Sequence, residues 1–403
     1  MKEPDVAIVG GGPAGAIVAS LLARAGHDVT LFERSPAYRW RACGVFASPA
    51  TVAALRRVGL DEATLARVAR PIPAMRVETP TGICFRLPYG DREPVGFDRS
   101  ALDPALLDEA RLAGASVCTG ARVEALDLDA ARPVLQVRTA QGLERHTARL
   151  VVGADGGNSI VARAARVARS AQLAPRVGLT FHLEDRPGDP RADARMRVFR
   201  DGYVGVAPVP GGRVNLGIVL GRSWGPRLAA DGAEAIAEEV VSGIPVRDGA
   251  AGSPPDPAAW RAGVRLDRVA GASPLGHRVT RRAGSTWLVV GDAAGFLDPF
   301  TGEGLHRAVV SAELAARAVA AALRGNPRAL PAYDRAMRRR FAAKDVVSWL
   351  VQVFLERPAL FEYAARRIAA RDAVRETMGL VMGDLVPASR ALDPRYLGAL
   401  LRP

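Results

Sequence analysis

The sequence has little lysine, few aromatic residues and no long hydrophobic run. Only Lys2 and Lys344 are lysines among 55 basic residues, so the formal net charge of +13 comes from arginine. No run of basic residues is longer than Arg338–Arg340, and aromatic residues make up 5% of the chain. A nucleic-acid-binding surface needs a basic patch with a recognisable reading element, which the sequence lacks. We therefore expect no nucleic-acid partner, and we leave open a peripheral contact with anionic membrane surfaces.

Cysteine is also scarce, which excludes a disulfide framework. The sequence has three cysteines, Cys43, Cys84 and Cys118, so they cannot all pair with one another. They form no C-x-x-C motif and no Cys/His spacing that is typical of a metal site. This cysteine usage fits a reducing cytoplasm. No stretch of about 18 uninterrupted apolar residues occurs, so we expect no membrane-spanning helix. The 403 residues, of which 49% are hydrophobic, indicate a globular protein of two or three domains.

The N-terminal segment predicts a nucleotide-binding unit. Residues 5–9 read as a buried parallel strand, residues 16–25 as a helix and residues 28–32 as a second strand. A glycine-rich turn joins the first strand to the helix. This order of strand, turn, helix and strand is typical of a dinucleotide-binding βαβ unit.

The turn has the residues that a pyrophosphate site needs, in G-x-G-x-x-G register. Gly10 allows the tight turn, Gly12 lets a pyrophosphate approach the backbone, and Gly15 lets helix and strand pack closely. Backbone N–H groups at the helix N-terminus would bind the phosphates. We expect cofactor contacts from Gly10, Gly12, Pro13, Ala14 and Gly15.

An acidic residue ends the second strand. The carboxylate of Glu33 is placed to accept hydrogen bonds from ribose hydroxyls, and we expect the neighbouring Arg34 to contact the cofactor as well. A carboxylate at this point disfavours a ribose 2′-phosphate. FAD or NAD is therefore favoured over NADP.

Two further motifs follow predicted strands. Residues 150–164 predict a buried strand that ends in Gly153-Ala154-Asp155-Gly156, with a helix beginning near Ser159. Residues 287–310 predict a strand that delivers Asp292 to its C-terminal end, followed by a Gly/Pro loop and a long helix. Ligands of doubly wound sheets bind at the C-terminal ends of the strands, so all three motifs should face one crevice.

In this order, the three motifs resemble those of the FAD-dependent superfamily that contains p-hydroxybenzoate hydroxylase and geranylgeranyl reductase. The resemblance covers about residues 1–330. It implies an FAD-dependent oxidoreductase with an α/β fold: a doubly wound FAD-binding domain, an inserted antiparallel β-sheet substrate domain and a helical C-terminal cap.

The resemblance also implies roles for individual residues. Asp292 would hold the ribityl chain of FAD, and the helix N-terminus at Gly304 would stabilise negative charge at the flavin pyrimidine edge. Arg99 would pack on FAD, and the backbone of Val123 would contact the adenine. Asp155 would mainly support the local fold. The implied cofactor contacts are Cys43, Gly44, Arg99, Val123, Asp155, Gly291, Asp292, Pro299, Gly302, Gly304 and Leu305.

Two local features favour the reductase branch over the hydroxylase branch. The pair Cys43-Gly44 resembles an element that geranylgeranyl reductases place near the isoalloxazine ring, although Val45 stands where these enzymes usually have a second glycine. Gly295 stands where the aromatic hydroxylases usually have histidine. Our first hypothesis is hydride transfer between the flavin and a C=C bond of an apolar substrate. The alternative is a monooxygenase that hydroxylates an aromatic or polyketide-like substrate through a C4a-hydroperoxyflavin with NAD(P)H.

No second G-x-G-x-x-G is present, so we expect NAD(P)H to bind transiently as the electron donor, or a protein donor to replace it. The sequence assigns no catalytic residue. Cys43 is a candidate thiol because Arg39 and Arg41 are near it in sequence, and His306 is a candidate proton donor. The alternative reading is a small residue against the flavin for Cys43 and an ordinary helix-face residue for His306.

We divide the chain into three parts. The FAD-binding domain comprises residues 1–74, 97–171 and 263–330, the β-rich substrate domain residues 75–96 and 172–262, and the helical C-terminal region residues 331–403.

In the substrate domain, alternating residues predict strands at 195–200, 202–208 and 213–220, and residues 75–89 should add a strand pair. Four apolar residues are expected to line the substrate pocket or to fill the sheet core: Phe181, Phe199, Tyr203 and Val206. They indicate a hydrophobic or aromatic small-molecule substrate.

The C-terminal region should contain separate helices at 333–344, 346–355 and 360–370. The apolar run 346–355 is either the packed face of a capping helix or part of a substrate channel or membrane contact. The sequence leaves open the substrate identity, the oligomeric state and whether the flavin is covalently held.

Overall fold

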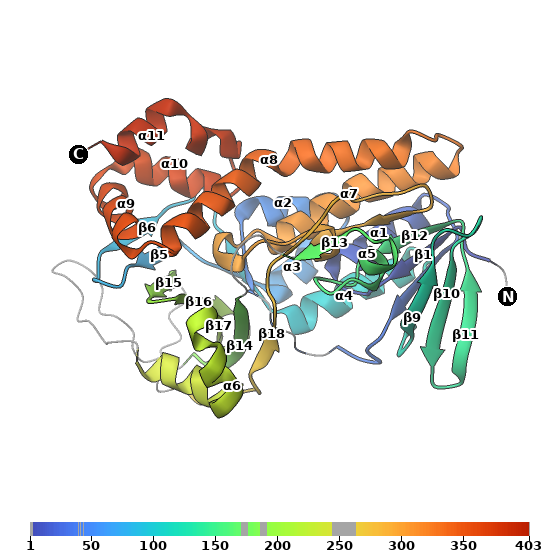
Figure 1. The fold of residues 1–403 in the computed structure, drawn as a ribbon, viewed down its shortest axis with the longest axis horizontal. Coiled ribbons are helices and arrows are strands. Elements are labelled where there is room, and N and C mark those ends of the chain that lie inside the picture. The colour runs from blue at the N-terminus through green and yellow to red at the C-terminus, as the bar shows by residue number, and fades with distance from the viewer. Residues whose placement is uncertain are drawn as a thin grey trace.

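The computed structural model describes residues 3–38, 40, 42, 44–170, 176–185, 192–243 and 263–402. A five-stranded parallel sheet forms its centre, in the order β20-β12-β1-β2-β8 (Figure 1). The strands are β1 (Val6–Val9), β2 (Val29–Glu33), β8 (Ser116–Thr119), β12 (Leu150–Gly153) and β20 (Trp287–Val289). Their short apolar sequences suit strands covered on both faces, and β1 and β12 are buried throughout.

The register of this sheet brings the three motifs to one edge. Val9 pairs with Gly153, and Gly153 pairs with Val289, so the three strands end side by side. The turns that follow them must therefore leave the sheet at the same edge, as the sequence predicted.

Three helices pack against one another beside the parallel sheet. They are α1 (Pro13–Arg24), α4 (Arg99–Leu112) and α7 (Gly304–Leu323), and their apolar residues join the strands in the largest core cluster. The short helix α5 (Ile160–Ala164) begins after Ser159, which caps it by accepting a hydrogen bond from the Ala162 N–H. The predicted helix near Ser159 is thus confirmed.

A second, seven-stranded sheet has the order β18-β14-β17-β16-β15-β5-β6. Its strands are β5 (Met75–Glu78), β6 (Cys84–Leu87), β14 (Val177–Glu184), β15 (Ala194–Phe199), β16 (Gly202–Val209), β17 (Arg213–Leu220) and β18 (Ala270–Ala272). The predicted hairpins are confirmed, and residues 75–89 do supply a strand pair. The prediction of a wholly antiparallel sheet was wrong at one place, because β5 and β15 run parallel.

Helix α6 (Gly225–Ser242) covers one face of this second sheet. Its Ile236, Ala237 and Val240 form a core cluster with side chains of β14, β16 and β17. Side chains alternate across a strand, so the neighbouring residues of these strands point to the opposite face. We call that opposite face the inner face of the sheet.

The C-terminal region is helical, but its first helix was predicted wrongly. Helix α8 is continuous from Ala329 to Leu355, where the sequence had suggested two helices divided near Lys344 and Asp345. The polar pair does not interrupt the helix because Lys344 is buried against other charged groups and Asp345 pairs with Arg307 of α7.

Three further helices complete this region: α9 (Pro358–Ala370), α10 (Asp372–Met382) and α11 (Pro394–Leu401). In Figure 1, α9 and α10 lie beside β6, and residues of both helices contact this strand. No helix among the described residues is long and apolar enough to cross a membrane.

The remaining elements are small. A meander of β9 (Arg122–Asp127), β10 (Val134–Thr139) and β11 (Gly142–Thr147) forms one sheet, and β3 (Phe46–Ala47), β7 (Val95–Phe97) and β4 (Ala69–Pro71) form another. Strands β13 (Ala168–Ser170) and β19 (His277–Val279) pair with each other. Helices α2 (Pro49–Arg57) and α3 (Glu62–Val68) lie between β3 and β4 in sequence.

Candidate cofactor and active site

The glycine-rich turn is shaped by two close backbone approaches. Gly10 has φ +104°, and a Cβ at this residue would lie 2.5 Å from the Ala154 carbonyl oxygen. A Cβ at Gly15 would lie 2.0 Å from the carbonyl oxygen of Gly10. Both distances are too short for a real side chain, so only glycine fits at these positions. The first turn therefore packs against its own helix and against the turn after β12.

Gly12 is different, because the space in front of it is open. A Cβ built on Gly12 would meet no atom within 4 Å, and Gly12 lies directly before Pro13, the first residue of α1. The free N–H groups of a helix N-terminus carry partial positive charge. This turn thus leaves an accessible cradle for an anion at the end of α1.

Glu33 is buried, and its carboxylate is held by the backbone. Oε2 accepts a hydrogen bond from the Gly11 N–H at 2.8 Å, and Oε1 accepts one from the Ser35 N–H at 2.9 Å. Glu33 therefore ties the glycine-rich turn to the end of β2. Its contact with a ribose remains a prediction, as does that of the exposed Arg34.

The third motif lies directly against the first. Gly291 has φ +55°, and a Cβ there would lie 3.0 Å from the Cβ of Ala14. The Gly291 N–H donates to the hydroxyl of Ser311 on α7 at 2.9 Å. These contacts fix the start of the loop that carries Asp292.

Asp292 is accessible to water and lies near positively charged side chains. The protein around it raises the pKa of its carboxyl by desolvation, while the charges of His277, Arg99 and Arg307 lower it. A group that is accessible and still surrounded by protein suits a bound polar ligand. Arg99 forms a bidentate ion pair with Asp103 of the same helix at 2.5 and 2.8 Å.

Asp155 supports the local fold, as the resemblance implied. Its Oδ2 accepts a hydrogen bond from the Ile160 N–H at 2.5 Å and so helps to cap α5. Burial raises the pKa of this carboxyl. Within the described residues, its Oδ1 is buried without a hydrogen-bond partner, so a role toward the cofactor stays a prediction.

Residues 3–349 match the family described as "FAD binding domain". The chain belongs to this FAD-binding family. The predicted doubly wound FAD-binding fold, with its second sheet and helical cap, is thereby confirmed, and the protein is an FAD-dependent oxidoreductase.

Several relatives of this FAD-binding protein are reductases. It is 28% identical to a menaquinone reductase of Mycobacterium tuberculosis over 77% of this chain and 75% of the relative. It is 30% identical to a digeranylgeranylglycerophospholipid reductase of Methanopyrus kandleri, over 78% of this chain and 79% of the relative. A protoasukamycin 4-monooxygenase of Streptomyces nodosus is 27% identical, over 87% and 88% of the two chains.

The fold is also similar to that of a solved geranylgeranyl bacteriochlorophyll reductase-like protein from Thermoplasma acidophilum. The TM-score is 0.74 at 20% identity, and the match covers 100% of this chain and 96% of the other. At this identity the likeness concerns the fold.

The residues present fit FAD. The open space at Gly12 would accept the pyrophosphate, and the accessible Asp292 would face the ribityl hydroxyls. Gly302 has φ +65°, and a Cβ there would come within 2.7 Å of the Phe46 ring, so this turn requires glycine. It leads directly into α7 at Gly304, whose N-terminus is a site for developing negative charge.

Four of the other cofactor contacts that the resemblance implied lie among the described residues. Pro299 begins a short 3-10 turn before Gly302, and Leu305 lies in the first turn of α7. Val123 is buried in β9, and Gly44 is exposed. Cys43 lies outside the described residues. All of these contacts stay predictions.

His306 does not suit the role of a proton donor. Its ring faces α8, where Arg340 donates to Nε2 at 3.2 Å, and burial lowers its pKa to about 4. A histidine held neutral in this way has no proton to give at neutral pH. The alternative reading, a helix-packing residue, fits the structure better.

Of the two expectations for the four apolar residues of the second sheet, the sheet-core reading fits three. Phe181, Phe199 and Val206 lie on the α6 side of the second sheet, in or against its core cluster. Successive side chains of a strand point to opposite faces of the sheet, and these three residues occupy the positions that face α6. Only Tyr203 lies on the inner face, where its hydroxyl donates to Asp298 at 2.5 Å and its ring meets Phe300 edge-on at 5.0 Å.

Asp298 is a functional candidate that the sequence reasoning missed. It is buried directly before Pro299 in the loop of residues 295–303, which we call the flavin loop. It accepts from the Phe300 N–H at 2.9 Å and pairs with Arg176 at 3.2 Å. Desolvation raises the pKa of its carboxyl, which Arg176 opposes. The Tyr203–Asp298 bond joins the inner face to the flavin loop. The sequence signal that could have identified Asp298 is an aspartate within a loop rich in glycine and proline.

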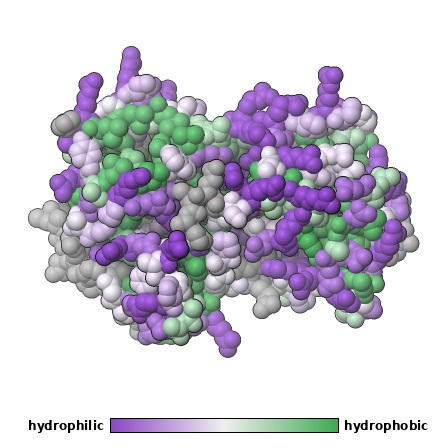
Figure 2. All heavy atoms as spheres, in the orientation of Figure 1, coloured by the Kyte–Doolittle hydropathy of each residue, from purple (hydrophilic) through white to green (hydrophobic). Residues whose placement is uncertain are grey.

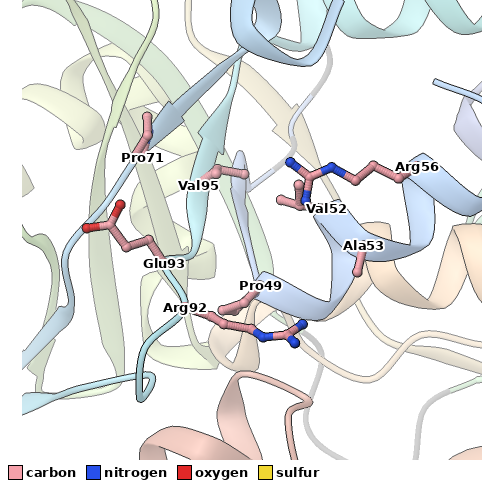
Figure 3. Close-up of a pocket in the computed structure, with 8 residues that line it drawn as sticks. All are labelled: Pro49, Val52, Ala53, Arg56, Pro71, Arg92, Glu93 and Val95. Carbon is pink, nitrogen blue, oxygen red and sulfur yellow. The ribbon is translucent and has the colours of Figure 1, made fainter. Parts of the chain in front are cut away.

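One open pocket lies elsewhere, between α2 and the strands β4 and β7 (Figure 3). Its volume is about 460 Å³. Its apolar lining is Val52, Ala53 and Val95 with two prolines, and its charged residues are exposed, with Arg56 paired to Glu62 at 2.5 Å. It contains no group suited to redox chemistry.

Proposed function

We propose that this protein transfers a hydride from reduced FAD to a C=C bond of an apolar, isoprenoid-type substrate. The names of two reductase relatives each refer to an isoprenoid compound. One names menaquinone, and the other names a lipid with geranylgeranyl groups. The single structural observation that carries the proposal is the inner face of the second sheet, which the Tyr203–Asp298 bond joins to the flavin loop.

We propose that an extended chain lies along a strip of this face. Thr180, Gly217 and Gly205 pair across three neighbouring strands, and two of these three residues have no side chain. A Cβ on Gly217 would meet nothing within 4 Å. The buried Tyr203 ring and the half-buried Phe300 ring border the strip on the side of the flavin loop.

When bound, FAD supplies the two-electron chemistry. The residues of the chain bind and orient it: the α1 N-terminus holds the pyrophosphate, Asp292 the ribityl chain, and the α7 N-terminus favours negative charge at the pyrimidine edge. The buried Asp298 fixes the loop between these groups. The protein thus sets orientation and solvent access, while the cofactor carries out the redox step.

NAD(P)H is the electron donor that we propose, bound transiently because the sequence has one G-x-G-x-x-G motif. Stopped-flow mixing of oxidised enzyme with NADH or NADPH would measure flavin bleaching at about 450 nm. Rapid bleaching with either nucleotide supports this donor. No bleaching with both would point to a protein donor.

The main test uses reduced, FAD-loaded enzyme under nitrogen. We expect menaquinone or a geranylgeranyl lipid to reoxidise the flavin and to gain two hydrogens, measured by mass spectrometry. Mixing with aerated buffer and an aromatic acceptor tests the alternative. A transient C4a-hydroperoxyflavin spectrum with an oxygenated product would establish the monooxygenase and overturn the reductase.

An apolar substrate also suggests a peripheral membrane contact in the cytoplasm, which we propose as the setting of the reaction. Val346 and Trp349 of α8 are each 45% exposed, and Leu401 is 47% exposed. Figure 2 shows a hydrophobic area over the C-terminal helices with hydrophilic side chains around it. Flotation with anionic vesicles tests this: Trp349→Ser should bind less than wild type, and equal binding would contradict the contact.

A further inference from the structure

A buried histidine on the inner face of the second sheet pairs with a half-buried aspartate. We propose that His182, oriented by Asp267, delivers the proton that completes reduction of the substrate. This inference rests on the proposed function and adds to it a residue in a stated chemical role.

Strand register places His182 beside the proposed substrate strip. Leu179, Phe181 and Leu183 of β14 pack toward α6, so His182 points to the inner face. Its cross-strand partner is Asn215 of β17, one row away from the Thr180–Gly217 pair. The row on the other side of the two glycines contains Tyr203, which contacts the flavin loop. The strip therefore lies between His182 and that loop.

Asp267 fixes both the backbone and the ring of His182. Its Oδ1 accepts from the His182 N–H at 2.7 Å, and its Oδ2 lies 2.7 Å from Nδ1. A carboxylate at Nδ1 keeps a proton on that nitrogen and fixes the orientation of the ring. Nε2 is then the nitrogen that can give a proton away.

The surroundings of Nε2 favour a ligand over a structural partner. His182 is only 4% exposed, yet the described part of the chain provides no hydrogen bond to Nε2. Nε2 is not one of the fully buried side-chain atoms that lack a partner, so it stays accessible to a bound molecule. The Trp40 ring covers the imidazole at 4.3 Å.

Trp40 also contacts the proposed substrate strip. Its Nε1 donates to the Thr180 carbonyl at 3.4 Å, and its ring lies against His182. His182 therefore lies next to the strip and under the same indole ring.

The proposed step is balanced. Bound reduced FAD would supply a hydride to one carbon of the C=C bond, and His182 would give the Nε2 proton to the other carbon as the π bond breaks. His182 would then regain a proton from water, and the cofactor would be left oxidised. A nicotinamide or another two-electron donor then reduces FAD again.

The kinetic test compares His182→Gln with wild type in single turnovers of pre-reduced enzyme under nitrogen. We expect the transfer step to slow about 100-fold or more, with FAD affinity and flavin reduction unchanged, because general acid catalysis contributes about 10²–10⁴-fold. His182→Ala should regain at least about tenfold with added imidazole, which a structural role would not produce. His146→Gln is the matched control, since His146 also pairs with a carboxylate, Glu144 at 3.1 Å.

A second measurement does not depend on turnover. The chain has five histidines, so the ring Hε1 resonance of His182 can be assigned by its loss in His182→Gln. Adding geranylgeraniol in detergent to the FAD-loaded protein should shift this resonance and leave that of His146 in place. An unshifted His182 signal, or transfer in His182→Gln within threefold of wild type, would overturn the inference. A wild-type enzyme that reduces no isoprenoid acceptor would instead refute the proposed function.

Discussion

The three motif glycines of the first turn meet three different physical demands. Gly10 combines a left-handed φ with a close approach to the turn after β12, and Gly15 meets the backbone of Gly10. Gly12 has no such neighbour. The first two glycines are therefore needed to form the fold, and Gly12 is needed to leave room for the cofactor.

A matched pair of alanine variants separates these demands. Gly15→Ala should lower the free energy of unfolding by about 3 kcal/mol or more, since its Cβ overlaps backbone. Gly12→Ala should unfold like wild type but bind FAD about tenfold more weakly. Urea unfolding of the apoprotein and FAD fluorescence titration measure the two effects. Equal destabilisation by both variants would contradict this division.

His306 gives a pH-dependent contribution to stability. Burial lowers its pKa to about 4 from the usual 6.5, with Asp384 opposing and Arg340 assisting the shift. As the pH falls, the unfolded chain binds this proton before the folded protein does. The stability contribution is complete above pH 6.5 and is lost as the pH falls toward 4.

We expect this loss to amount to about 3 kcal/mol between pH 7 and pH 4. His306→Gln removes the titration, so its free energy of unfolding should fall less steeply over this range. Urea unfolding at several pH values measures the slope. Parallel slopes for the two proteins would show that His306 does not titrate in this way.

At the scale of elements, a buried ionic cluster joins the C-terminal region to the start of α7. Lys344 of α8 is 4% exposed and lies 2.8 Å from Asp384 and 3.9 Å from Glu303, the residue between Gly302 and Gly304. Asp384 also accepts from the hydroxyl of Ser48 at 3.1 Å. One lysine thus connects the segment after α10 with the flavin loop.

Lys344→Met should lower the free energy of unfolding by about 3–5 kcal/mol, because it leaves Asp384 buried without its cation. The exposed Arg338→Met on the same helix is the control. Its ion pair with Asp334 is worth at most about 1 kcal/mol. Chemical unfolding at pH 7 compares them, and similar losses in both variants would refute a buried ionic role.

At the scale of the whole molecule, α8 belongs to the core of the FAD-binding part. Tyr333, Met337 and Phe341 join its largest core cluster, and the Tyr333 hydroxyl donates to the Val289 carbonyl of β20 at 2.7 Å. In Figure 1, α8 runs beside α7, and the two helices are in contact. The first part of α8 therefore belongs to this core, whereas α9, α10 and α11 pack with the second sheet.

Truncation after Leu330 should prevent stable folding, because it removes these three side chains and exposes the surface of α7 beneath them. We expect the shortened chain to aggregate or to bind no FAD, measured by gel filtration and absorbance. Tyr333→Phe is the milder variant and should cost about 1 kcal/mol. A truncated chain that is monomeric and binds FAD would contradict the shared core.

The sequence by itself determined the parallel sheet, its three motif turns and their common edge. These features depend on local patterns: an apolar strand, a glycine turn and a helix start each occupy a few consecutive residues. The same local reading divided α8 at Lys344, because a charged pair inside an apolar run looks like a boundary until its buried partners are known.

Only the tertiary structure decided which polar groups come together and what covers each face of the second sheet. Tyr203 and Asp298 are 95 residues apart, and His182 and Asp267 are 85 apart, so no local spacing predicts either pair. The same holds for the parallel pairing of β5 with β15. Alternation along a strand shows that two sets of side chains face opposite ways, but the positions of α6 and of the C-terminal helices decide what covers each set.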